Sequence, residues 1–225
     1  MNTTDWWYRS RFILALFMLG LYAVLWLWLS PGTRLSGNEI ENYLDRMETG
    51  LQMEVTEKRE FLARLRRWAE ADDGAPVHML NLIRFRDSMS AVPGHPEFTG
   101  TAQEANAHYE QVVLPLLARR GIYPVFASTP QGMGGGLESN LLGFEPELDF
   151  WDRVILVRYP SRRAFLDLAS DQAYMTVAPY KLGAIDLGFV PLDKSYQLPD
   201  PRGIAALLGI ALFLGIPALR KIIIK

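Results

Sequence analysis

Residues 151–193 carry the pattern that most limits the possible folds, because they combine a strand, a helix and a second strand. In residues 151–159 (WDRVILVRY) alternate side chains belong to opposite faces, which is the two-residue period of a β-strand. Pro160 ends this strand because proline has no amide hydrogen to donate, and Ser161 follows at the position of a helix N-cap. Residues 184–192 supply the returning strand. The helix between the strands presents two apolar side chains to a sheet, Phe165 and Leu168.

Two further strands and one helix are predicted upstream. Residues 77–86 (VHMLNLIRFR) and 122–128 are rich in strand-forming residues, and residues 101–120 have a helical apolar repeat that ends at Gly121. The element order is then β-α-β-β-α-β. We therefore predict an α+β fold of the ferredoxin-like split βαβ type, with two helices on an antiparallel sheet.

The ends of the chain are strongly apolar. Residues 12–29 (FILALFMLGLYAVLWLWL) contain no charge and, as a helix, would extend about 27 Å, close to the hydrocarbon thickness of a bilayer. A signal peptide is the alternative, but the run is longer than a signal core and no clear cleavage site follows. Residues 203–219 form a second uncharged run, apolar on all sides, which argues against a buried amphipathic helix. We predict flanking transmembrane helices at residues 12–30 and 203–219.

Basic residues near the ends favour one orientation. Arg9 and Arg11 precede the first run, and residues 220–225 (RKIIIK) follow the second, whereas the inner flanks carry fewer close charges. Because basic residues stay on the cytoplasmic side, residues 1–11 and 220–225 are predicted to be cytoplasmic. The chain is thus expected to cross the inner (cytoplasmic) membrane twice, with its central domain, residues 76–193, in the periplasm or otherwise extracytoplasmic. The lipid bilayer is its expected partner.

Residues 31–75 are predicted to form an amphipathic helical connector, and residues 194–202 a linker. Two apolar stripes at helical spacing indicate two helices in the connector, separated near Gly50. Thr56 is the expected N-cap of the second helix.

Composition excludes several classes of site. The chain has no cysteine, so it has no disulfide, no thiolate metal site and no cysteine nucleophile. Its net charge of −2 gives no positive field to hold nucleic acid. The spacing of His78, His95 and His108 matches no metal-binding motif, and the glycine-rich residues 132–136 (GMGGG) match no nucleotide fingerprint. We therefore expect no metal and no cofactor.

Four segments carry a resemblance to a known family: NLIRF, NAHYEQVVLPLLARRG, WDRVILVRYPSRRAFLDL and AYMTVAPYKLGAIDL. Across about residues 76–192 they resemble the domain-of-unknown-function 1330 family, which belongs to the dimeric α/β-barrel superfamily. The resemblance implies a homodimer in which two sheets pair into a barrel. Relatives in that superfamily include cofactor-independent monooxygenases, dismutating and isomerising enzymes, and haem-handling proteins.

His78 and Asn81 are the candidate catalytic residues. On the predicted strand His78 shares a face with Leu80 and Leu82, whereas Asn81 is the polar member of the opposite face. Since a buried amide needs hydrogen-bond partners, Asn81 either fixes a neighbouring loop or points into a cavity.

Four more residues are candidate ligand-binding positions: Tyr109, Arg158, Tyr174 and Tyr180. The tyrosines lie on helices that face the sheet, where core packing is the commoner role. Arg158 can bind an anionic ligand or form a structural ion pair. Arg162 and Arg163 stand at the start of a helix, where the helix dipole disfavours cations, which suggests an outside carboxylate or lipid phosphate as partner.

Two functions fit these features. The first is a membrane-anchored extracytoplasmic domain that binds a small apolar or aromatic molecule and, if catalytic, performs cofactor-independent oxygenase or isomerase chemistry. The second is a non-enzymatic accessory or assembly subunit of a larger membrane complex. An enclosed pocket reached by His78, Asn81 or Arg158 favours the first, and a filled sheet with an exposed apolar patch favours the second.

Overall fold

The computed structural model describes residues 3–92, 98–131, 151–192 and 201–223, with side chains from residue 12 up to residue 212. Two compact units are present: residues 31–194 form one, and the two ends of the chain, up to Ser30 and from Ser195 onward, form the other. His95, residues 132–136 and most of the predicted linker lie outside the described residues.

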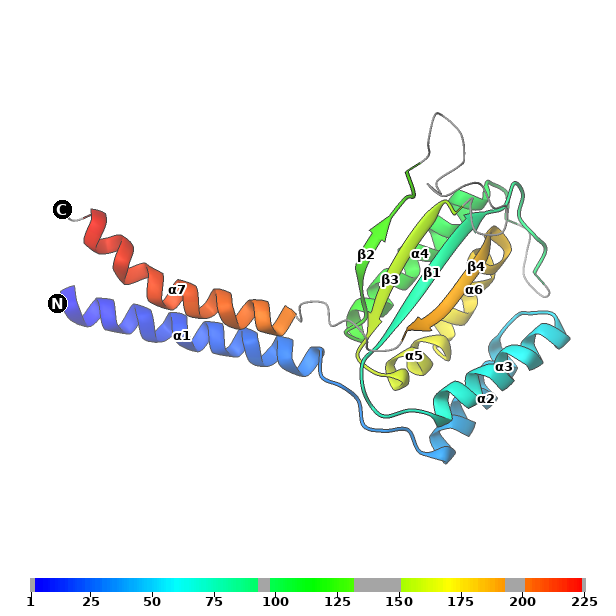
Figure 1. Cartoon of the computed structure of the whole chain (residues 1–225), viewed down its shortest axis with the longest axis horizontal. Helices are drawn as coiled ribbons and strands as arrows, with labels where there is room; N and C mark the ends of the chain where they lie inside the picture. The colour runs from blue at the N-terminus through cyan, green and yellow to red at the C-terminus, as the bar shows by residue number, and fades with distance from the viewer. Residues whose placement is uncertain (1–2, 93–97, 132–150, 193–200, 224–225) are drawn as a thin grey trace, which may run out of the picture. The chain divides into compact units, whose positions relative to one another are not determined.

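Residues 31–194 are built around a four-stranded antiparallel sheet with the order β2-β3-β1-β4 (Figure 1). Its strands are β1 (Val77–Phe85), β2 (Tyr123–Ser128), β3 (Arg153–Tyr159) and β4 (Ile185–Leu192). The connecting helices are α4 (Ala102–Arg119), α5 (Arg162–Ala169) and α6 (Gln172–Ala184). The predicted α+β class and the antiparallel sheet are confirmed. One detail differs, because two helices connect β3 to β4 where one was predicted.

The break between α5 and α6 falls at Ser170 and Asp171. Ser170 caps the end of α5, and the Asp171 carboxylate accepts a hydrogen bond from the amide of Ala173 at the start of α6. A short side chain that satisfies the exposed amides of a first turn starts a new helix. The chain therefore changes direction here, and α6 lies beside α4.

Strand register divides the sheet into two faces. The helix-side face carries Met79, Asn81, Ile83, Ile155, Val157, Phe189 and their neighbours, and the helices cover it. The opposite face, called the open face here, carries His78, Leu80, Leu82, Phe126, Val154, Leu156, Arg158, Val190 and Leu192. Phe126 is 52% exposed and Val190 is 43% exposed, so the open face is apolar and only partly covered.

The predicted connector contains α2 (Gly37–Gly50) and α3 (Val55–Glu70), which pack on the domain. The predicted break near Gly50 is confirmed. The predicted cap is wrong, because Glu54 and not Thr56 caps α3: its carboxylate accepts from the amides of Thr56 and Glu57. A glutamate just outside the first turn serves both as hydrogen-bond acceptor and as a negative charge near the positive helix end.

Two contacts join α2 to α5. Arg163 donates from Nη1 to Glu39 Oε1 at 2.5 Å, and the Tyr43 hydroxyl donates to Asp167 at 2.5 Å. Arg162 donates to the backbone carbonyl of Trp68 at 2.7 Å. The two arginines at the start of α5 thus have partners inside the chain, and the predicted outside partner is not needed to explain them.

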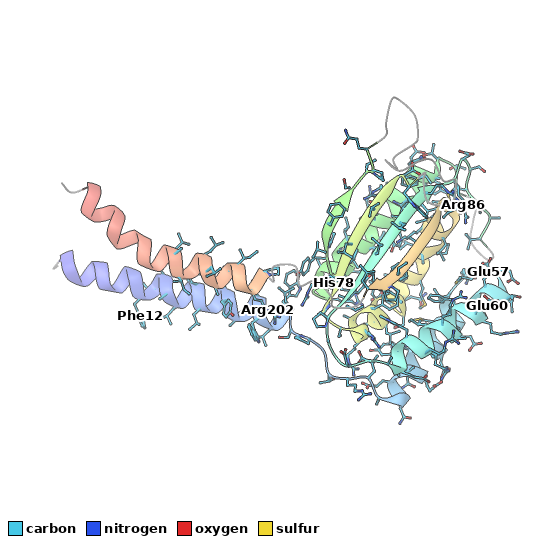
Figure 2. The ribbon with its side chains drawn as sticks, in the orientation of Figure 1. Phe12, Glu57, Glu60, His78, Arg86 and Arg202 are labelled. Atoms are coloured by element: carbon cyan, nitrogen blue, oxygen red, sulfur yellow. The ribbon has the colours of Figure 1, made fainter. Side chains whose placement is uncertain are left out.

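The second unit contains α1 (Thr3–Trp28) and α7 (Pro201–Ile223) (Figure 1). Arg202 lies 4.6 Å from the ring centre of Trp26, a cation–π contact between the two helices. Large apolar side chains project outward from α1, among them Phe12, which is 65% exposed (Figure 2). Within the described residues, no helix meets the length and apolarity required of a membrane span. The two transmembrane helices stay a prediction.

Candidate ligand-binding site

A cavity of about 750 Å³ lies between the helix-side face of the sheet and helices α3, α4, α5 and α6. Its walls are mostly apolar, with Ile155, Val157 and Phe189 from the strands and Trp68 and Phe165 from the helices. Trp68 and Phe165 meet edge to face with 5.3 Å between ring centres. This pair of rings forms part of the cavity wall.

Helical spacing explains why α4 and α6 line the cavity. Their lining residues recur three or four positions apart, so each set forms one stripe along its helix. From α4 the stripe includes Asn106, Tyr109, Glu110, Val113 and Leu117, and from α6 it includes Tyr174, Ala178 and Lys181. Polar groups therefore enter an apolar space from two adjacent helices.

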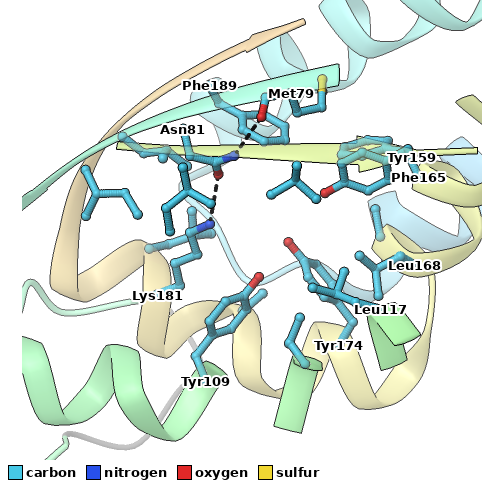
Figure 3. Close-up of a pocket in the computed structure, with 18 of the residues that line it drawn as sticks. Met79, Asn81, Tyr109, Leu117, Tyr159, Phe165, Leu168, Tyr174, Lys181 and Phe189 are labelled. Atoms are coloured by element: carbon cyan, nitrogen blue, oxygen red, sulfur yellow. Dashed lines mark hydrogen bonds between the residues drawn. The ribbon is translucent and has the colours of Figure 1, made fainter. Parts of the chain in front are cut away.

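Lys181 is one of the charged residues that line the cavity. Its Nζ donates to the side-chain oxygen of Asn81 at 3.4 Å and lies 5.3 Å from the ring centre of Tyr109 (Figure 3). Burial lowers the pKa of Lys181 to about 8, because an ammonium loses its hydration in apolar surroundings. Among the described residues Lys181 forms no salt bridge. A substantial fraction of this lysine is thus neutral in mildly alkaline solution.

Three phenols also border the cavity: Tyr109, Tyr159 and Tyr174 (Figure 3). The rings of Tyr109 and Tyr174 meet edge to face, with 6.0 Å between their centres. Burial raises the pKa of each of the three phenols above its ordinary value. The phenols consequently keep their protons at neutral pH and can donate hydrogen bonds.

A paired set of polar residues forms another side of the site. Arg153 donates to Glu110 at 2.7 Å, and the amide nitrogen of Asn106 donates to the same carboxylate at 3.0 Å. Asn106 is 2% exposed, and its side-chain oxygen has no hydrogen-bond partner in the described part of the chain. Glu110 is paired with Arg153 and forms no salt bridge with Lys181, although its charge raises the pKa of that lysine.

The structure brings some of the predicted site residues together and separates others. Asn81, Tyr109 and Tyr174 line the cavity. His78 and Arg158 lie opposite each other on the open face, and burial, followed by the charge of Arg158, lowers the pKa of His78. Tyr180 packs edge to face against Phe98 and His108, with ring centres 5.4 Å and 4.9 Å away.

The sequence analysis did not select Lys181 as a site residue, although its position along helix α6 is unusual for a lysine. It stands three residues after Ala178 and seven residues after Tyr174, on the stripe of α6 that also carries apolar residues. A lysine on the apolar stripe of a helix is unusual, because lysine side chains are mostly exposed, whereas Lys181 is partly buried. No cluster of three or more His, Cys, Asp or Glu suited to a metal ion occurs in the residues that the structure describes.

Comparison with solved structures finds matches that include the following two. One is the RPA0582 protein of unknown function from Rhodopseudomonas palustris, 28% identical, with a TM-score of 0.48; the match covers 62% of this chain and 94% of that one. The other is the methylated RPA0582 protein, 25% identical, with a TM-score of 0.49; this match covers 66% of this chain and 100% of that one. No protein-family model and no curated protein matches the chain.

Proposed function

We propose that the domain binds a small apolar or aromatic molecule in the cavity between its sheet and its helices. The observation that carries this proposal is a space of about 750 Å³ with largely apolar walls and a few converging polar groups from Asn81, Tyr109 and Lys181. Ligand sites in proteins have this size and composition, with apolar walls for affinity and few polar groups for orientation.

If the site is catalytic, proton transfer is the chemistry that its residues support. A lysine with a pKa of about 8 can accept a proton near neutral pH, and the protonated phenol of Tyr109 can donate one. These groups favour isomerase chemistry. They assign the acid–base roles to Lys181 and Tyr109, with Asn81 as an orienting group. His78, a catalytic candidate from the sequence, is left out of these roles because it lies on the other face of the sheet.

Binding is tested with fluorotoluene, an apolar aromatic probe, by fluorine NMR on the full chain in phosphatidylcholine nanodiscs. We expect line broadening beyond that of empty nanodiscs. Ala178→Phe should remove this excess, because Ala178 lines the cavity and the added ring fills it. Val190→Phe, on the open face, serves as the matched control and should bind like the parent. Equal broadening in the parent and in Ala178→Phe would refute the proposal.

The second part of the proposal is that α1 and α7 anchor the domain to the inner (cytoplasmic) membrane as two spans, with cytoplasmic termini and an extracytoplasmic domain. Its support is the uncharged run in each helix together with exposed apolar side chains, such as Phe17 at 66% and Leu207 at 70%. Exposed apolar surface on this scale marks contact with lipid or protein. Alkaline carbonate should leave the chain in the membrane pellet, and its release into the supernatant would refute the anchor.

The open face supports a homodimer, which is also what resemblance to the domain-of-unknown-function 1330 family implies. A second copy would cover Leu80, Leu82, Leu156 and Val190 and so complete a barrel. The same exposed face supports the alternative function, that of an accessory subunit whose open face contacts another member of a membrane complex. The mass of the detergent-solubilised particle separates these cases. A protein mass equal to two copies of this chain, with no other protein, supports the homodimer.

A further inference from the structure

We propose that Lys181 captures an apolar or aromatic aldehyde or ketone in the cavity as a reversible imine. This inference rests on the proposed function, since it names the class of molecule that the same cavity takes. The geometry behind it is an amine that points into an apolar space beside one amide oxygen and one aromatic ring.

The lack of a salt bridge to Lys181 in the described part of the chain distinguishes it from a structural lysine. A structural lysine in the interior is normally paired with a carboxylate, which keeps it charged and unreactive. Glu110, the carboxylate that lines this cavity, is bound to Arg153 at 2.7 Å and to Asn106 at 3.0 Å. Burial is the largest influence on the pKa of Lys181; the charge of Glu110 raises this pKa and the charge of Arg153 lowers it.

Desolvation makes the amine a nucleophile near neutral pH. With a pKa of about 8, Lys181 is about one-tenth neutral at pH 7. At that pH the neutral fraction of an ordinary lysine is smaller by a factor on the order of a hundred. Desolvation in an apolar pocket is an established way to activate a lysine for attack on a carbonyl.

The step balances without a redox partner. The nitrogen lone pair of Lys181 attacks the carbonyl carbon, a C–N bond forms, and the π electrons move to the oxygen. A proton passes from nitrogen to that oxygen and gives a carbinolamine. Loss of a second proton from nitrogen and protonation of the hydroxyl then release water and leave a C=N bond. Hydrolysis reverses the sequence.

Neighbouring groups suit this chemistry. The Tyr109 phenol keeps its proton and can donate to the carbonyl oxygen, which polarises the carbonyl during attack. The unpaired side-chain oxygen of Asn106 can accept from the hydroxyl of the carbinolamine. Apolar walls exclude bulk water and so slow hydrolysis of the imine.

The test treats the full chain in phosphatidylcholine nanodiscs, whose lipids carry no primary amine, with benzaldehyde and sodium cyanoborohydride near pH 7. Cyanoborohydride reduces an imine to a stable benzyl amine, which peptide mass spectrometry locates. Lys58, whose ammonium donates to the backbone oxygen of Glu48 at 3.0 Å on an exposed surface, is the internal comparison. We expect Lys181 to be labelled faster than Lys58 by a factor on the order of a hundred, and excess fluorotoluene to suppress that labelling alone.

Two variants complete the test. Lys181→Met fits the apolar walls and should abolish cavity labelling while Lys58 reacts as before. Ala178→Phe keeps the lysine and fills the cavity, so it should slow Lys181 to the rate of Lys58. Labelling of Lys181 no faster than that of Lys58, in protein that still broadens the fluorotoluene signal, overturns the imine proposal and leaves the proposed function intact. If the parent protein shows neither faster labelling of Lys181 nor broadening of the fluorotoluene signal, both the imine proposal and the proposed function are overturned.

Discussion

Asn81 and Lys181 meet inside the domain although a hundred residues separate them in the sequence, with 3.4 Å between the amide oxygen and the amine nitrogen. Asn81 stands on the central strand β1 and Lys181 on helix α6, so this contact joins the sheet to the helix layer (Figure 3). The Asn81 amide nitrogen donates to the Met79 carbonyl at 3.2 Å, which leaves its oxygen turned toward Lys181.

Replacing Asn81 should make Lys181 easier to deprotonate. A hydrogen bond to the ammonium favours the charged form, and Asn81→Leu removes it. We expect the midpoint of the pH–rate profile for reductive benzylation of Lys181 to fall by about 0.5–1 pH unit. His78→Ala, on the other face of the sheet, is the control and should leave the midpoint where it is. A midpoint that rises in Asn81→Leu contradicts the assigned contact.

Lys181 should lower the free energy of unfolding of the domain at neutral pH. Its pKa is 10.5 in the unfolded chain and about 8 in the folded one, so the unfolded state binds more protons between these values and stability rises with pH through this window. Below pH 8 the folded state carries the full cost of burying the Lys181 ammonium. Lys181→Met should therefore raise the free energy of unfolding by about 1–3 kcal/mol at pH 7, and less at pH 10.

This is measured by urea unfolding at both pH values, with Lys58→Met as the matched control. The control should show no comparable gain. A Lys181→Met variant that is less stable than the parent at pH 7 would show that the lysine is structurally required.

Glu39 should contribute stability that acid removes. The hydrogen bond from Arg163 and those within the Ser36 capping box lower the pKa of Glu39 from 4.5 to about 2. Its contribution is therefore complete above pH 4.5 and is lost as the pH falls toward 2. Glu39→Gln should lower the thermal midpoint at pH 7, and the difference from the parent should shrink steadily below pH 4.5. Glu48→Gln, on the same helix, should show neither effect.

The open face should govern the oligomeric state. Leu82 lies at its centre, where it is paired with Val154 and Gly188 on the neighbouring strands. Leu82→Glu places a charge on a surface that a second copy would bury, and an unpaired buried charge opposes association. Light scattering of the solubilised protein should shift from two copies to one. Val55→Glu, at a residue 66% exposed on α3, should remain dimeric.

Sequence patterns predicted the sheet and its helices well because strand alternation and proline or glycine stops are local signals. Alternation alone separates the face of β1 that carries Asn81 from the face that carries His78. Tyr109 and Tyr174 were also placed correctly on helices facing the sheet, by helical spacing. The spacing of residues along the sequence does not give the distance between the sheet and the helix layer. It therefore could not show that the layers leave a cavity, or that Lys181 would meet Asn81 in it.

Other misses have a similar origin. Arg163 looked misplaced at a helix start because its partner, Glu39, is 124 residues away in the sequence. Likewise, His78 and Arg158 were grouped with Asn81 as possible pocket residues, although register places their strand positions on the opposite face. Alternation within one strand separated His78 from Asn81, but only pairing between strands shows which face the helices cover.

The most direct test of the cavity as the binding site is a crystal structure of the full chain soaked with bromobenzene, with the bromine located by its anomalous signal. The account predicts a bromine peak inside the domain, between Lys181 of α6 and the helix-side face of β1, and no such peak in Ala178→Phe. A cavity free of bromine, with the halogen only on the open face or along α1 and α7, would contradict it.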